Sequence, residues 1–109
     1  MVSKVSYLGM KCVAYTMIIC GEVKHVGFRR FIWGLAKRLN LSGYVRNLPD
    51  NCIEVYVEGD HQKIEELKDK VLNSRIYNVE DIKIAKSECK YLYEDFAILR
   101  CVGESEEFY

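Results

Sequence analysis

A change of hydrophobic period runs through residues 12–43, CVAYTMIICGEVKHVGFRRFIWGLAKRLNLSG. Residues 12–20 form an apolar run rich in Val, Ile, Tyr and Thr, which is typical of a buried strand. After this run the apolar side chains recur at helical spacing, at Phe28, Phe31, Ile32, Leu35 and Leu39. Asn40 and Gly43 tolerate left-handed backbone geometry, so we expect them to end the helix.

Two short strands follow this predicted helix. Residues 43–47 and the alternating segment 53–58 flank the turn Leu48-Pro49-Asp50-Asn51 and are expected to pair as a hairpin. Asp60 is a suitable N-cap for a second helix, which has an apolar face made by Ile64, Leu67 and Val71.

Residues 77–85 alternate again, and residues 96–102 are apolar enough for a last strand. This order predicts an α+β fold, the ferredoxin-like split βαβ sandwich. In it a βαββαβ chain forms an antiparallel sheet with two helices on one face, and the last segment is a possible extra C-terminal strand. We expect one domain over residues 12–102, an N-terminal extension at 1–11 and a C-terminal tail at 103–109.

The composition is that of an ordinary globular protein. Half of the 109 residues are apolar, and 16 basic residues balance 16 acidic ones. A nucleic-acid or membrane partner normally requires a basic excess, so neither is expected. The apolar run at 12–20 is too short to span a bilayer, and no targeting segment is evident.

The cysteines do not follow a metal-binding or disulfide pattern. Their number is odd and no CxxC spacing occurs among Cys12, Cys20, Cys52, Cys89 and Cys101. We therefore expect no metal site, buried thiols and a reducing, cytoplasmic location.

Candidate chemistry concentrates at GEVKHVGFRRF, residues 21–31. The amides at a helix start and the positive end of its dipole favour an anion. Arg29 lies in the first helical turn, and its side chain should lean back over the loop. A guanidinium there can bind two phosphate oxygens, although an arginine at this position can also be a solvated surface charge. Asn47, at a strand end, is either a turn-stabilising residue or a holder of water.

Two ordered signatures in the chain resemble those of the acylphosphatase family. The first is a strand-ending G-x-V-Q-G-V-x-F-R, matched by Gly21, Val23, Val26, Phe28 and Arg29. The second is G-Y/W-V-x-N with a nearby turn and a V-x-V continuation, matched by Gly43, Tyr44, Val45, Asn47, Asp50, Val55, Val57 and Gly59. The likeness covers about residues 13–100.

The resemblance implies a role for each matched residue. Arg29 would be the phosphate-binding arginine, and Asn47 would orient the attacking water. The phosphate would be cradled by backbone amides of Lys24, His25, Val26, Gly27, Phe28 and Arg29. The implied activity is hydrolysis of small acyl phosphates to a carboxylate and inorganic phosphate, with no metal and no cofactor.

The sequence departs from the family at three positions. Lys24 replaces glutamine, His25 replaces the cradle glycine, and Asn51 replaces the glycine of the turn. Asn51 is benign because asparagine also tolerates positive φ. His25 leaves three outcomes open: a tolerated surface side chain, an added phosphate contact, or a distorted and poorly active loop.

These departures leave alternatives to the enzyme. One is a non-catalytic anion-binding or regulatory module on the same fold, which His25 favours. Another is an RNA-binding domain of the same element order, which lacks support because neither aromatic RNA-binding motifs nor basic excess is evident. The expected partner is a small-molecule acyl phosphate, and neither a nucleic acid nor a membrane is expected. We expect the protein to be a monomer or a weak homo-oligomer.

Overall fold

The computed structural model describes residues 12–24, 26–75 and 77–101. Along the chain, the elements are β1 (Cys12–Glu22), α1 (Val26–Arg38), β2 (Ser42–Asn47), β3 (Cys52–Asp60), α2 (His61–Leu72), β4 (Asn78–Ser87) and β5 (Phe96–Ile98). This is the predicted order. The predicted extensions at 1–11 and 103–109 lie outside the described residues, as do His25 and Ile76.

The five strands form one sheet in the order β4-β1-β3-β2-β5. β1 pairs antiparallel with β3 and β4, and the predicted hairpin of β2 and β3 is confirmed. The sheet is nevertheless mixed, because β5 runs parallel to β2, with Val45 opposite Ile98. The predicted antiparallel sheet is confirmed for β1 to β4, and the predicted extra C-terminal strand joins it in the parallel direction. A hairpin turn forces neighbouring strands to be antiparallel, whereas the connection at 88–95 is long enough for β5 to enter from the other end.

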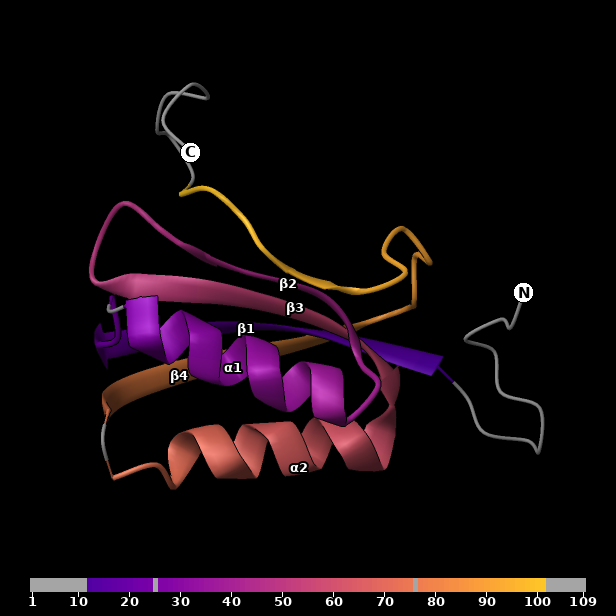
Figure 1. Cartoon of the computed structure of the whole chain (residues 1–109), viewed down its shortest axis with the longest axis horizontal. Coiled ribbons are helices and arrows are strands. Elements are labelled where there is room, and N and C mark those ends of the chain that lie inside the picture. Colours follow the sequence, from indigo (N-terminus) through magenta and orange to yellow (C-terminus); the bar gives the residue numbers. More distant parts are fainter. Residues whose placement is uncertain (1–11, 25, 76, 102–109) are drawn as a thin grey trace.

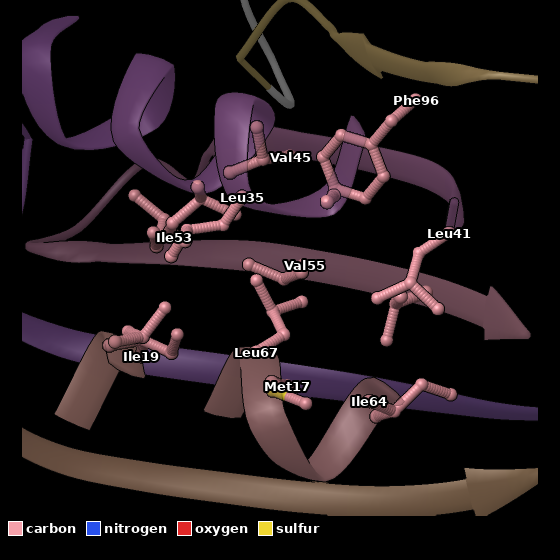
Figure 2. Packing of buried hydrophobic residues seen from close by; sticks show 14 of the residues in the cluster. Met17, Ile19, Leu35, Leu41, Val45, Ile53, Val55, Ile64, Leu67 and Phe96 are labelled. Atoms are coloured by element: carbon pink, nitrogen blue, oxygen red, sulfur yellow. The ribbon is translucent and has the colours of Figure 1, made fainter. Parts of the chain in front are cut away.

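Both helices cover one face of the sheet and lie side by side (Figure 1). The apolar stripe of α1, apart from the half-buried Phe31, is buried against the inward-facing residues of the central strands. The three predicted residues of α2, Ile64, Leu67 and Val71, are buried there too. Figure 2 shows side chains from both layers pointing toward one another, among them Leu35, Leu67, Val45, Ile53 and Val55. This shared core fixes α1 on the sheet. Among the described residues, no helix is long and apolar enough to cross a membrane.

The ends of the elements differ from the expectation in a few places. Asn40 adopts φ +58° just past α1, as predicted, but Gly43 lies inside β2 at φ +138°. A Cβ at Gly43 would lie 1.9 Å from the Tyr56 carbonyl oxygen, so glycine is required there by the close approach of β3. Asp60 precedes α2, but its side chain caps no amide. β5 ends at Ile98, before the expected residue 102.

The cysteines are not all thiols, which corrects the sequence expectation. Cys12 is bonded to Cys89, and Cys20 to Cys52; Cys101 belongs to neither disulfide. Cys20 and Cys52 are far apart in the sequence but lie opposite each other in the β1–β3 ladder. Their pairing follows from strand register, which spacing along the chain does not reveal.

Candidate active site

The loop between β1 and α1 begins inside the sheet. β1 extends to Glu22, and its ladder with β4 shifts register between Cys20 and Gly21. Gly21 has φ +135°, and a Cβ there would lie 2.3 Å from the Asn78 carbonyl oxygen. The Gly21 amide donates a 3.0 Å hydrogen bond to the Asn51 carbonyl oxygen. The loop is therefore anchored to β4 and to the β2–β3 turn before α1 starts.

The predicted cradle residues are arranged around the start of α1. Lys24 is exposed and Gly27 is exposed. Phe28 is fully buried, with its ring 4.5 Å from that of Tyr77, so only its backbone can reach a ligand. α1 begins at Val26 and has no acidic residue in its first turn. Its first amides have no partner within the helix, and no carboxylate of that turn competes with an incoming anion.

Arg29 and Asn47 share an unusual property. Among the residues that the structure describes, Arg29 Nε and Asn47 Oδ1 are the buried side-chain nitrogen and oxygen atoms with no hydrogen-bond partner. Buried polar groups are nearly always paired, so each unpaired one calls for an explanation. One is a donor and the other an acceptor, which suits a ligand site that receives a phosphate oxygen and a water.

The topology brings these two residues to one end of the molecule. Arg29 is in the first turn of α1, and Asn47 is the last residue of β2, opposite Ile53. In Figure 1 the start of α1 and the turn that joins β2 to β3 lie at the same end. That turn is closed by a 3.0 Å hydrogen bond from the Leu48 amide to the Cys52 carbonyl oxygen.

Asn51 does not adopt the positive φ that asparagine would tolerate in this turn. Among the described non-glycine residues, only Asn40 and Tyr91 have positive φ. Asn51 therefore replaces glycine without needing left-handed geometry, and its contribution is the carbonyl oxygen that receives the Gly21 amide.

Tyr44, Tyr56 and His61 contact other aromatic side chains. Tyr44 and Tyr56 stack with their centroids 5.6 Å apart, packed on the sheet. Burial, followed by the nearby Glu54 carboxylate, raises the pKa of Tyr44. His61 is exposed, and its Nδ1 lies 3.2 Å from the Tyr15 hydroxyl. Within the described part of the chain, no group of three or more His, Cys, Asp or Glu is placed to hold a metal ion.

Sequence reasoning did not identify one feature beside the site. A groove of about 380 Å³ is lined by Arg30, Trp33, Gly34 and Ile98. The spacing of Arg30, Trp33 and Gly34 on one helical face is a signal in the sequence. No such signal predicts that Ile98 lines the groove, because its position depends on the parallel pairing of β5.

Comparison with known proteins gives a consistent result. The family model described as "Acylphosphatase" matches residues 15–98. An acylphosphatase of Chlorobaculum tepidum is 36% identical over 84 residues, which are 76% of this chain and 91% of that protein. An acylphosphatase of Syntrophotalea carbinolica is 44% identical over 57 residues, 52% of this chain and 62% of the relative.

Solved structures agree with the sequence relatives. The crystal structure of acylphosphatase from Bacillus subtilis superposes with a TM-score of 0.74 and 31% identity. The superposition covers 80% of this chain and 98% of that one. The family match over residues 15–98 includes the loop before α1 and the hairpin of β2 and β3.

Proposed function

Because the chain belongs to the acylphosphatase family of hydrolases, we propose that it hydrolyses small acyl phosphates to a carboxylate and inorganic phosphate without a metal ion. The observation that carries this proposal is the pair of unpartnered buried atoms, Arg29 Nε and Asn47 Oδ1, at one end of the fold. A donor and an acceptor left without partners inside a protein are costly unless a ligand or water binds them.

In the proposed site, the phosphoryl group lies at the start of α1. The guanidinium of Arg29 binds phosphate oxygens, and the backbone amides from Lys24 to Arg29 donate to the others. His25 is included in this segment only because of its position in the sequence, since it lies outside the described residues. Arginine keeps its proton at any physiological pH, so the site holds its positive charge throughout the reaction. Donors fixed in a protein stabilise developing charge without having to reorganise.

Asn47 is proposed to hold the attacking water. Its Oδ1 accepts a hydrogen bond from the water, which orients a lone pair toward phosphorus. A bond forms between the water oxygen and phosphorus, and the bond from phosphorus to the acyl oxygen breaks. The electron pair leaves with the carboxylate, and both water protons remain on the phosphate. Because a carboxylate is a good leaving group, positioning and charge stabilisation suffice.

The experiment is hydrolysis of acetyl phosphate in the presence of a chelator, by wild type and Arg29→Ala. Loss of Arg29 is expected to lower kcat/KM on the order of 10²-fold or more. Arg38→Ala is the matched control, because Arg38 is exposed at the far end of the same helix. An equal loss in both variants would show that total charge matters rather than the position of Arg29.

A second candidate rests on His25, which replaces the cradle glycine. On this view the protein binds phosphate-like anions without turning them over. Wild-type hydrolysis no faster than the buffer blank, together with phosphate binding that depends on Arg29, would favour it over the enzyme.

We further propose that the protein acts on free small molecules, as a monomer or weak homo-oligomer, and not on nucleic acid or membranes. The zero formal net charge supports the expectation of no nucleic-acid or membrane partner, because both normally require a basic excess. A cytoplasmic location is also retained as a proposal, but it no longer rests on free thiols, because four cysteines are paired.

A further inference from the structure

A groove runs between α1 and β5, beside the end of the fold that holds Arg29 and Asn47. Arg30, Trp33 and Gly34 form its helical wall, and Ile98 of β5 forms the facing wall. Trp33 and Ile98 are 39% and 37% exposed, so both present apolar surface to the groove. The groove is thus an apolar depression with one charged residue at its rim.

Its position relative to the proposed phosphate site follows from the register. Arg30 directly follows Arg29 in the first turns of α1. Ile98 lies opposite Val45, which is two residues before Asn47 on β2. One wall therefore begins at the residue that follows Arg29 on α1, and the other pairs with β2 two residues before Asn47. This places the groove next to both elements of the proposed phosphate site.

The walls of the groove are fixed before any ligand arrives. The Trp33 Nε1 donates a 3.0 Å hydrogen bond to the Phe96 carbonyl oxygen, which ties the indole to β5. The Lys37 ammonium lies 5.4 Å from the Trp33 ring and bonds both Asp95 carboxylate oxygens, at 2.7 and 2.9 Å. These contacts hold the indole in one orientation, so binding does not have to order it.

We propose that this groove binds the acyl group of the substrate and favours acyl phosphates with a planar, apolar acyl part. The inference rests on the proposed function, because it takes the phosphoryl end to be held by Arg29. A planar group can stack on the indole while Gly34 leaves room beneath it. Arg30, at the rim next to Arg29, adds positive charge that attracts the anionic phosphoryl end of the substrate to this end of α1.

The decisive variant fills the groove rather than deleting part of its wall. A Cβ at Gly34 would lie 3.6 Å from Arg38 Nη1, an ordinary contact, so Gly34→Leu should fold. The measurement is the ratio of kcat/KM for benzoyl phosphate to that for acetyl phosphate. We expect wild type to prefer benzoyl phosphate, and Gly34→Leu to lower the ratio about tenfold. Gln62→Leu, an exposed site on α2, is the control and should keep the ratio.

A binding measurement separates this inference from the proposed function. Benzoate, the product of benzoyl phosphate hydrolysis, is titrated into wild type and Gly34→Leu and followed by NMR shifts of the Trp33 indole. Shifts that occur in wild type and are lost in Gly34→Leu support the groove, even if neither protein hydrolyses acyl phosphates. Hydrolysis by both proteins with an unchanged substrate ratio would overturn the groove and leave the proposed function standing. Benzoate shifts that are identical in the two proteins would also overturn it.

Discussion

The Tyr56 hydroxyl donates a 2.6 Å hydrogen bond to Glu58 Oε2, two residues further along β3 on the sheet face away from the helices. The same oxygen accepts the backbone amides of Lys90 and Tyr91 at 2.6 and 3.0 Å. Among the described residues, Glu58 is the only buried charged side chain. One carboxylate therefore holds the connection at 88–95 against the outer face of the sheet.

Glu58→Ala is expected to destabilise the protein by about 3 kcal/mol, because it leaves a hydroxyl and two amides without their acceptor. Urea unfolding measures the free energy of unfolding. The control is Glu54→Ala, on the same face of the same strand, which removes the 2.7 Å pair with Arg46. That pair is partly exposed and should be worth about 1 kcal/mol or less. Equal losses in the two variants would contradict a special role for Glu58.

The pKa of Tyr56 is raised from 10.0, first by burial and then by its hydrogen bond to Glu58. A raised folded-state pKa means that the folded state keeps this proton after the unfolded chain has lost it. The stabilisation is therefore complete below about pH 10 and is lost as pH rises further, at about 1.4 kcal/mol per pH unit for this group. Tyr56→Phe is expected to reduce that slope between pH 10 and 11.5, measured by urea unfolding. A slope identical to that of wild type would show that Tyr56 is not responsible.

Local patterns predicted most of the fold. The stripe from Phe28 to Leu39 identified α1, because a helix buries residues of its own segment at a fixed period. The direction of β5 was not predictable in this way. The connection before β5 contacts Glu58 through the amides of Lys90 and Tyr91, and contacts between residues so far apart in the sequence leave no local pattern.

In the candidate site, too, the features with a local motif were predicted, and those that depend on strand pairing were not. Arg29 and Asn47 were proposed from their motifs, and the topology brings their two elements to one end. The disulfide of Cys20 and Cys52 was missed because it depends on the register of β1 against β3. The groove was missed for a similar reason, since Ile98 reaches it through a parallel pairing at the sheet edge.

The two disulfides are expected to appear in the isolated protein. Unfolded without reductant and treated with iodoacetamide, the chain should take up one label, at Cys101, and five labels after reduction. Mass spectrometry counts them; five labels without reductant would contradict the pairing. The sequence separations are 77 residues for Cys12–Cys89 and 32 for Cys20–Cys52. Reduction should lower the free energy of unfolding by about 3–5 kcal/mol per bridge on chain-entropy grounds.

His25→Gly tests the departure from the family motif. We expect both the wild type and the variant to hydrolyse acyl phosphates. A histidine facing the phosphate would change its charge as the pH changes and so alter kcat/KM across pH 5–8, and that change would disappear in the variant. Superimposable profiles would remove any role for His25 in binding. A large gain in activity in the variant at every pH would instead indicate that histidine distorts the loop.

Asn47→Ala is expected to lower kcat on the order of 10²-fold while leaving inhibition by inorganic phosphate within about threefold of wild type. The reason is that the amide is proposed to hold the water, which matters for attack, whereas Arg29 and the loop hold the phosphate. Steady-state kinetics with acetyl phosphate and phosphate as inhibitor measure both quantities.

Asn51→Ala is the matched control for this variant. Asn51 is exposed in the adjoining turn, and its carbonyl oxygen, which receives the Gly21 amide, is retained in alanine. Its kcat should therefore stay close to that of wild type. Asn47→Asp adds a second arm: it keeps an oxygen acceptor for the water but introduces a negative charge beside the phosphate, so phosphate inhibition should weaken. If Asn47→Ala weakens phosphate inhibition as strongly as it lowers kcat, the amide binds the phosphoryl group itself and the water must be oriented by another residue.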